Sequence, residues 1–386
     1  MNAVIAGYVR TPFTFAKKGA LRDVRPDDLA ATAMSALLKR TDIDPMLIED
    51  VLMGCAYPEG PQGNNIARIA ALLAGLPIET AGATINRFCG SSMYGIHVAA
   101  GQIAIGAGEA FIVAGVESMS MVPQGGLNFN PNPRFASADN PEAEVAIRAY
   151  TSMGATAENV AKRFGVTRED QERFAFASHM KAVKARESGK LSDELTSVLL
   201  KDGTIIDRDG CIRPQTTLEA LASLKPAFGE NGTVTAGTAS PLTDGAVALL
   251  ITSEKFAQAH NLPVTARIRT SAVAGVSPEI MGMGPVPATR KALSRAGLTI
   301  DDIDVIEINE AFSSQAIACM RELQMDPAKT NLDGGALALG HPLGASGARI
   351  TAKAAQIMAR EDKKIALATQ CIGGGQGIAT ILESVR

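Results

Sequence analysis

Two stretches of the chain, 255 residues apart, follow the same order of elements. Residues 27–54 have the pattern of a helix followed by a short apolar strand, and residues 287–308 have the same pattern. A similar strand precedes each stretch, VIAGYVRTP from residue 4 and VTARIRTSA from residue 264. Shared order together with shared residues indicates a duplicated unit. The matching positions are Ala33 with Ala288, Leu38 with Leu293, Arg40 with Arg295, Ile48 with Ile303, Val51 with Ile306 and Met53 with Ile308.

Each half of the chain alternates short apolar strands with helices. In the first half a helix over about 91–106 precedes the apolar strand 110–114. In the second half a helix over about 346–360 precedes the strand 364–368. Such alternation predicts a mixed, mostly parallel α/β sheet with helices on both faces. We expect two such sheets to pack against each other, with catalytic loops where strands give way to helices.

The middle of the chain does not fit the repeat. Residues 126–141 are rich in Pro, Asn and Gly, which is typical of a loop. Residues 158–190 predict two helices with a turn at Gly165, and Thr167 and Asp170 have the spacing of a capping box. We therefore expect an insertion that covers the active site. The expected division is 1–115 with 251–263 as the N-terminal half, 116–250 as an inserted loop domain and 264–386 as the C-terminal half.

Charge and cysteine usage argue against several classes of protein. The 386 residues carry a net charge of −3, a balance that does not favour binding to nucleic acid or to a membrane. Five cysteines at these spacings predict neither a disulfide framework nor, with the four histidines, a metal site. No apolar run reaches the roughly 20 residues of a membrane span, and the N-terminus lacks a signal-peptide pattern. We expect a cytoplasmic protein without a metal.

Two cysteines, Cys89 and Cys371, end apolar strand-like runs where glycine-rich turns begin. Cys89 also precedes a helix. At a helix N-terminus, free N–H groups and the helix dipole lower the pKa of a thiol, which suits a nucleophile. The alternative is a buried structural cysteine, which is the role we expect for Cys55. The turn after Cys371, GGGQG, lacks the spacing of a dinucleotide loop, so nucleotide binding is not expected there.

One histidine, His341, stands in the glycine-dense segment GGALALGHPLGASGAR, which opens a helix. So many glycines let the backbone approach a ligand closely, which favours a catalytic role for this histidine. The other three, His97, His179 and His260, lie within or beside predicted helices, and we expect them to be structural or exposed. Asn309 ends a predicted strand, where a polar side chain either serves a site or caps the next helix.

Four motifs, NRFCGSS, NEAF, GGALALGHPLGASGAR and CIGGGQG, occur in this order and together resemble the thiolases. The resemblance spans the full length, including TAGTASPLTDGA and IMGMGPVPA, and is strongest to the degradative 3-ketoacyl-CoA thiolases of fatty-acid β-oxidation. It implies an α/β fold, the duplicated thiolase fold, with two mixed sheets, helices in layers (αβαβα) and an inserted loop domain. It also implies an acyltransferase that cleaves 3-ketoacyl-CoA by a ping-pong, acyl-cysteine mechanism, with coenzyme A as a substrate and no cofactor.

The resemblance assigns roles to individual residues. Cys89 matches the acylated nucleophile, His341 the base that activates it, and Cys371 the second acid/base. Asn309 matches the residue that holds a water in one oxyanion hole with His341, and the N–H groups of Cys89 and Gly373 match a second oxyanion hole. The residues that match substrate contacts are Ser240, Ala236, Gly237 and Phe228 along the pantetheine arm, Arg213 near the nucleotide end, Met153 and Met281 at the acyl pocket, and Ala311 and Phe312 of the NEAF motif.

Ser152 stands where short-chain biosynthetic thiolases carry histidine, which argues against an enzyme restricted to acetoacetyl-CoA. A biosynthetic acetoacetyl-CoA thiolase, which condenses two acetyl-CoA molecules, is the first alternative. A ketosynthase would carry a histidine where Cys371 stands, and a non-catalytic CoA- or lipid-binding protein would not need all four catalytic residues. The resemblance further implies a homodimer or homotetramer, and it leaves open a multifunctional hydratase/dehydrogenase partner.

Overall fold

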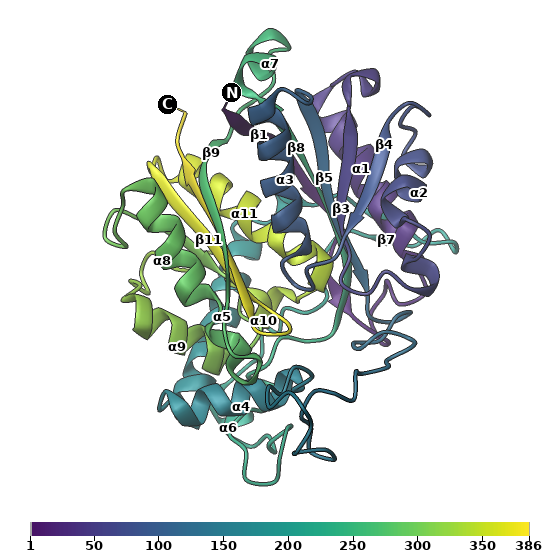
Figure 1. Cartoon of the computed structure of the whole chain (residues 1–386). Helices are drawn as coiled ribbons and strands as arrows, with labels where there is room; N and C mark the ends of the chain where they lie inside the picture. The colour runs from purple at the N-terminus through teal and green to yellow at the C-terminus, as the bar shows by residue number, and fades with distance from the viewer. Residues whose placement is uncertain (1, 386) are drawn as a thin grey trace.

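The computed structural model describes residues 2–385, and a continuous path of hydrogen-bonded strands runs through both halves (Figure 1). In the N-terminal half the order is β4 (Ala81–Ile85), β3 (Asp50–Gly54), β5 (Ala110–Ser118), β8 (Thr243–Ser253) and β1 (Ala3–Arg10), with the short β2 (Thr14–Phe15) paired to β8. Strand β3 is parallel to β4 and β5, whereas β8 is antiparallel to β5 and β1. The N-terminal sheet is therefore mixed, as expected.

The C-terminal half repeats this topology. Its strands lie in the order β10 (Val305–Ile308), β11 (Ile365–Ile372), β12 (Gln376–Glu383) and β9 (Ala266–Gly275). Strand β11 is parallel to β10, and β12 is antiparallel to both β11 and β9, which matches β5, β3, β8 and β1. Thr330 forms a parallel bridge to Ile306, at the position that β4 occupies beside β3. The shared pairings confirm the predicted duplication.

The two sheets meet edge to edge. Strands β1 and β9 pair through only two residue pairs, Val4 with Arg267 and Ile5 with Ala266. We expected two separate sheets. This short antiparallel contact joins the two sheets into one path of hydrogen-bonded strands. Beyond it the strands diverge, which leaves room for helices between the sheets (Figure 1).

Helices form three layers around the two sheets. The outer face of the N-terminal sheet is covered by α1 (Pro26–Thr41) and α2 (Ile66–Leu73), and that of the C-terminal sheet by α8 (Pro285–Ala296) and α9 (Ser313–Leu323). Between the sheets, α3 (Ser91–Ile105) packs against α11 (Leu343–Arg360) (Figure 1). Successive strand residues face different layers, as a period of two requires. In β5, for example, Ile112 faces the outer core and Val113 the central one.

Close approach of the two central helices depends on small residues. A Cβ atom at Gly347 of α11 would lie 2.6 Å from the backbone nitrogen of Met93 in α3. One at Gly344 would lie 2.6 Å from the carbonyl oxygen of Gly54. The glycines of the GHPLGASGAR segment therefore let the start of α11 lie directly on the N-terminal half, which brings the His341 segment toward the Cys89 turn.

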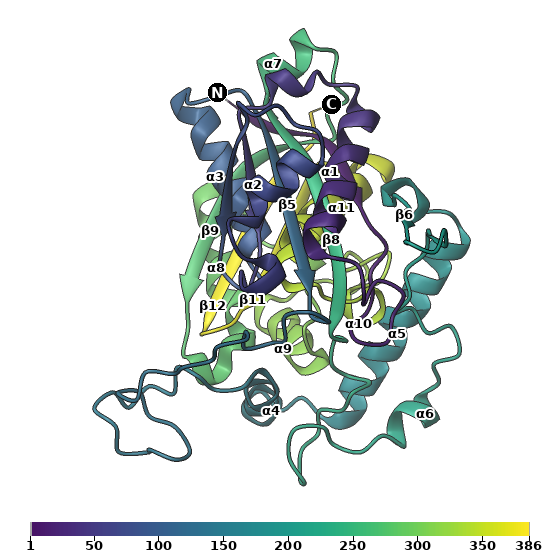
Figure 2. The ribbon, with the colours of Figure 1, turned by 90° about the vertical axis from the view of Figure 1, so that its right-hand side faces the viewer.

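The insertion between β5 and β8 holds two long helices and several short elements. They are α4 (Met153–Arg163), α5 (Arg168–Glu187), η3 (Ser192–Glu194), β6 (Val198–Leu199), β7 (Ile205–Ile206) and α6 (Leu218–Ala222). The capping box of Thr167 and Asp170 is present at the start of α5. Figure 2 shows the irregular segment before α4 projecting away from the layered body.

The end of the insertion differs from the expected boundary. Strand β8 begins at Thr243, so residues 243–250 lie in the N-terminal sheet and not in the insertion. Every residue of β8 is buried, so its sequence shows no alternation that would have marked the start of a strand. The division into domains otherwise stays a prediction.

The remaining short elements connect the layers. They are η1 (Pro45–Leu47), η2 (Gly60–Gln62), α7 (Glu254–Ala259), η4 (Pro278–Met283) and α10 (Ala336–Leu339). Among residues 2–385, no helix combines the length and the apolar character needed to cross a membrane.

Candidate active site

Cys89 lies in a strained turn between β4 and α3. Phe88, directly before it, has a φ of 43°, a conformation that costs a bulky residue about 1–3 kcal/mol. Two local hydrogen bonds hold the turn: the Phe88 N–H donates to Asn86 Oδ1 at 2.9 Å, and the Arg87 N–H donates to Ser91 Oγ at 2.9 Å. Strain of this kind persists where the surroundings over-determine it, and here it places the thiol at the start of α3.

The Cys89 thiol is protonated at rest, contrary to the expectation from its helix-start position. Burial raises its pKa to about 11. The N–H groups of Gly373 and of Cys89 itself act in the opposite direction, but they do not offset the cost of burying a charge. A nucleophile in this state needs a base to remove its proton.

Cys371 lies in the C-terminal half, at the end of β11. The turn that follows it passes through Gly374 and Gly375, both with positive φ, before β12 returns. Cys371 is buried beside Met281, Ala311 and other apolar side chains. Burial raises its pKa well above the ordinary value, and the charge of a Cys89 thiolate raises it further. The two thiols are therefore close enough to influence each other.

His341 is held by a hydrogen bond on each ring nitrogen. Nδ1 lies 2.6 Å from the hydroxyl of Ser346, and that hydroxyl lies 3.0 Å from the carbonyl oxygen of Pro342. Because the hydroxyl has one proton, which it donates to Pro342, we assign a proton to Nδ1 and a free lone pair to Nε2. Burial, assisted by the charge of Arg349, lowers the pKa of His341 to about 3. The imidazole is therefore a neutral base with Nε2 available.

Asn309 faces that nitrogen from the end of β10. Its Nδ2 lies 3.3 Å from Nε2 of His341. Its Oδ1 is buried and has no hydrogen-bond partner among residues 2–385. A buried amide with an unsatisfied oxygen suits a site that receives a polar group, such as a water or a substrate atom. The structure thus brings Asn309 and His341 together, as the sequence predicted.

The chain is similar to a known family over nearly its full length. Two family models match the chain, "Thiolase, N-terminal domain" over residues 3–255 and "Thiolase, C-terminal domain" over residues 262–384. The chain belongs to the thiolase family. Relatives named 3-ketoacyl-CoA thiolase from Shewanella denitrificans and Shewanella loihica are 50% and 49% identical to it, covering 100% and 99% of both chains. The crystal structure of the Bacillus anthracis acetyl-CoA acetyltransferase matches with a TM-score of 0.89 at 37% identity, covering 100% of this chain and 99% of that one.

Three further residues of this thiolase contact the predicted catalytic residues or the segments that carry them, and the sequence analysis missed them. Ser346 binds His341, as described above. Gln370, next to Cys371, donates from its side-chain amide to the carbonyl oxygen of Cys89. Glu117 is the penultimate residue of β5 and is buried. A carboxylate inside the apolar run AFIVAGVES is the one signal that could have drawn attention to it.

Glu117 joins the two halves of the site. It accepts hydrogen bonds from the N–H of Ala56 at 2.8 Å and from the N–H of Gly344 at 2.9 Å. Gln62 Nε2 donates to its other oxygen at 2.8 Å. The residue therefore ties the segment after His341 to the N-terminal sheet, which orients the base relative to the nucleophile.

Most of the predicted substrate residues lie together beside Cys371. Phe228 and Phe312 meet edge to face with ring centroids 6.0 Å apart, and Phe228 is exposed. Met153 and Met281 belong to the same apolar cluster as Cys371 and Phe312. The Ser240 N–H donates to the carbonyl oxygen of Ala311 at 2.9 Å, and Ala236 and Gly237 lie in the turn just before. These side chains form one wall next to the thiol.

Arg213 has other neighbours. Its guanidinium lies 5.2 Å from the ring centroid of Phe15, and its backbone N–H donates to Nδ1 of His179 at 3.3 Å. No recorded contact links it to Phe228 or Phe312, so its place near the nucleotide end stays a prediction. A cavity of about 710 Å³ between α5 and α9 also lies apart, since the residues that line it include none of the predicted catalytic side chains.

Proposed function

We propose that this thiolase cleaves 3-ketoacyl-CoA with coenzyme A, releasing acetyl-CoA and an acyl-CoA two carbons shorter. Two observations carry the proposal. Asn309 faces Nε2 of a buried, neutral His341, and Gln370, next to Cys371, binds the carbonyl oxygen of Cys89, which holds the two buried thiols near each other. The names of the relatives that are half identical over their full length support the same substrate class. The pathway is then the breakdown of fatty acids by β-oxidation, in the cytoplasm.

The first step is the transfer of the Cys89 proton to Nε2 of His341. The thiolate attacks the 3-keto carbon, and the carbonyl oxygen becomes an oxyanion. The N–H groups of Cys89 and Gly373 are the donors assigned to that oxyanion, and both already approach the Cys89 sulfur at rest. Fixed donors aimed at a developing charge are worth about 3–4 kcal/mol each in such sites.

The second step breaks the bond between C2 and C3. Its electron pair passes to the acetyl-CoA fragment as an enolate, whose oxygen is assigned to protonated His341 and to a water held by Asn309. Cys371 then donates its proton to C2, and acetyl-CoA leaves. Burial suits Cys371 to this role, because a raised pKa keeps the proton in place until a carbanion-like atom takes it.

Coenzyme A reverses the proton transfers in the second half-reaction. Its thiol gives a proton to the Cys371 thiolate and attacks the acyl group on Cys89. The acyl-enzyme bond breaks, Cys89 leaves as a thiolate, and His341 returns the proton to it. All groups are then restored, so no external acid or base is consumed.

Cleavage of longer chains is favoured over the biosynthetic alternative. Ser152 caps α4, where its Oγ accepts from the N–H of Ala155, so the position usually held by histidine in short-chain enzymes has a structural role here. Flexible Met153 and Met281 beside Cys371 suit a pocket for varied acyl tails. The structural neighbour named acetyl-CoA acetyltransferase is the more distant match at 37% identity, against 50% for relatives named 3-ketoacyl-CoA thiolase.

The oligomer we propose is a homodimer formed at the free edge of β4, with a tetramer as a further possibility. Within residues 2–385, strand β4 pairs with β3 alone, so its outer edge is free to pair with another strand. Large apolar side chains are exposed on the adjacent α2 and the loop after it: Ile69, Leu72, Leu73 and Ile78. The exposed segment before α4 is a candidate surface for a tetramer contact or for a hydratase/dehydrogenase partner.

Thiolysis of 3-ketoacyl-CoA substrates of increasing length tests the proposal. We expect kcat/KM to rise from acetoacetyl-CoA toward medium chains, since each buried CH₂ adds about 0.8 kcal/mol of binding. Mass spectrometry after brief mixing with substrate should find the acyl group on Cys89. Label on Cys371 would contradict the assigned roles, and activity on acetoacetyl-CoA alone would favour the biosynthetic enzyme.

A further inference from the structure

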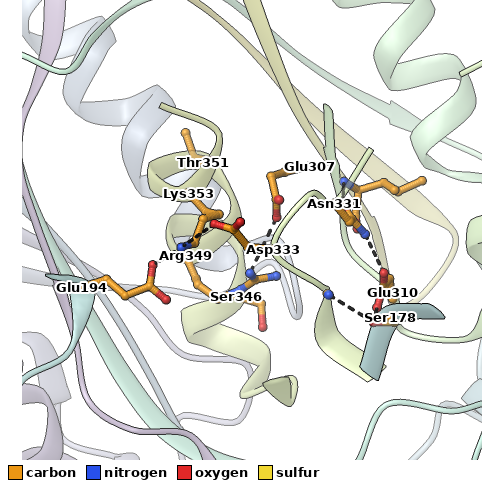
Figure 3. A network of polar contacts seen from close by, with 12 residues as sticks. Ser178, Glu194, Glu307, Glu310, Asn331, Asp333, Ser346, Arg349, Thr351 and Lys353 are labelled. Carbon is orange, nitrogen blue, oxygen red and sulfur yellow. Dashed lines mark hydrogen bonds and ion pairs between the residues drawn. The ribbon is translucent and has the colours of Figure 1, made fainter. Parts of the chain in front are cut away.

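A buried pair of opposite charges lies behind the proposed base. Arg349 of α11 and Glu307 of β10 are both fully buried, and Nη1 of the arginine lies 3.6 Å from Oε2 of the glutamate (Figure 3). Neither residue touches the reacting groups in any recorded contact. A buried charge is costly unless it is used or well compensated, so the pair calls for a physical explanation.

Arg349 is poorly compensated for a buried arginine. Among residues 2–385, none of its three guanidinium nitrogens has a hydrogen-bond partner, and neither has either carboxylate oxygen of Glu307. Burial raises the pKa of Glu307 to about 8 although Arg349 opposes this, so the counter-charge is incomplete at neutral pH. A positive charge in low dielectric with one weak partner acts strongly on other groups nearby.

The other buried cations of this region are better paired. Lys353, one turn further along α11, lies 2.6 Å from Glu194, and Arg10 lies 2.6 Å from Asp209. The charged and titratable groups that surround Arg349 and its neighbours come from β1, η3, β10 and the residues just after it, the segment before α10, and α11: Tyr8, Arg10, Glu194, Glu307, Glu310, Asp333, Lys353 and Arg360. Figure 3 shows five of them, Glu194, Glu307, Glu310, Asp333 and Lys353. Arg349 therefore stands out as the cation with the least local compensation.

Helix α11 brings that charge to the back of the imidazole. Arg349 follows Ser346 by three residues, so the two side chains leave the same face of the helix. The hydroxyl of Ser346 binds Nδ1 of His341, while Nε2 faces Asn309. The charge of Arg349 acts on the ring that Ser346 holds, and it opposes the second proton that would make His341 an imidazolium.

We propose that Arg349 is a positioning residue for the base: its charge adds to the effect of burial in holding the resting imidazole of His341 neutral, and with it Cys89 as a thiol, until substrate binds. The inference rests on the proposed role of His341 as the base. The polarised carbonyl of bound substrate begins to offset the effect of Arg349, so that His341 can take the Cys89 proton, and the oxyanion that forms next stabilises the imidazolium. An imidazolium disfavoured in this way is also a stronger acid, which helps it return its proton and stabilise the enolate.

Two measurements on Arg349→Gln should move in opposite directions. Without Arg349, the proton shifts more readily from Cys89 to His341, so alkylation of Cys89 by iodoacetamide at neutral pH should be about three- to tenfold faster. The kcat of thiolysis should fall, because the imidazolium is then a weaker acid. A purely structural role would lower both rates, and either that result or unchanged alkylation would overturn the proposal.

Matched variants keep the test decisive. Arg349→Lys retains the charge, so Cys89 should be alkylated in this variant at the rate of the unaltered protein. Lys353→Met removes an equally buried cation elsewhere on α11, and its Cys89 alkylation rate should also be unchanged. If Arg349→Gln does not fold, the double variant Glu307→Gln/Arg349→Gln, which leaves no unpaired charge, takes its place with the same expected rise. His341→Asn separates the two proposals. If this variant is alkylated at an unchanged rate, the assignment of His341 as the base fails. If it is alkylated more slowly but Arg349→Gln shows no rise, only the role of Arg349 is contradicted.

Discussion

The hydroxyl of Ser346 lies 2.6 Å from Nδ1 of His341 and donates its own proton to the carbonyl oxygen of Pro342. This geometry leaves the hydroxyl able to accept from Nδ1, so it selects the tautomer whose Nε2 is a base. One residue of α11 thereby decides which ring nitrogen of His341, the proposed base, can take a proton.

Ser346→Ala should lower the kcat of thiolysis by about ten- to a hundredfold, because a hydrogen bond to a group that becomes charged contributes about 1.5–3 kcal/mol. Steady-state kinetics measure this, and KM should change little. Thr351→Ala is the matched control, since that buried hydroxyl on the same helix bonds only to the carbonyl oxygen of Gly347 in the recorded contacts. Equal losses of kcat in both variants would show that Ser346 merely stabilises the helix.

Cys371→Ala should still be acylated on Cys89 in a single turnover, at a rate reduced about 10²- to 10⁴-fold by loss of the acid. It should not exchange the methyl protons of acetyl-CoA with solvent deuterium, because exchange needs a base at that carbon. Proton NMR of acetyl-CoA in D₂O measures the exchange. Cys319→Ala is a suitable control, since that thiol is buried in another cluster and contacts the carbonyl oxygen of Gly282. Near-normal exchange in Cys371→Ala would assign the acid/base to another group.

Gly154→Ala should weaken substrate binding without changing the chemistry. A Cβ atom at this position would lie 2.0 Å from the ring of Phe228, which must then leave its edge-to-face contact with Phe312. We expect KM for 3-ketoacyl-CoA to rise several-fold while Cys89 alkylation stays unchanged. Gly165→Ala is a comparison elsewhere in the insertion, at a turn where a Cβ meets no atom within 4 Å, although its φ of 60° adds some strain. An unchanged KM in Gly154→Ala would remove Phe228 from the substrate wall.

The destabilisation caused by His179→Asn should shrink as the pH falls. Burial lowers the pKa of His179 to about 4, below its ordinary value of about 6.5. The neutral ring therefore contributes stability that is complete above about pH 6.5 and is lost toward pH 4, at about 1.4 kcal/mol per pH unit. Urea unfolding at pH 7 and at pH 5 measures the free energy of unfolding of the protein and of the variant. The difference between the two should be about 2 kcal/mol smaller at pH 5 than at pH 7. A constant difference would mean that His179 titrates normally.

Much of the architecture is determined by the sequence itself. The 255-residue offset, the alternation of strands with helices and the capping box of Thr167 depend on local periodicity and on neighbours in the chain, and all three are present in the structure. The motifs also place Cys89, Cys371 and Asn309 at the ends of strands, where topology gathers them. The start of β8 at Thr243 could not be predicted, because a fully buried strand has no alternation of apolar and polar residues.

Only the tertiary structure decided the protonation of the site. A helix-start position predicts a low pKa for the Cys89 thiol, yet burial between the two halves raises it to about 11. The partners of His341 likewise could not be identified from the sequence. Ser346 reaches His341, and Arg349 meets Glu307, only because α11 lies between the two sheets. Desolvation and charge act through space, and a sequence records which residues are present but not which of them are removed from water together.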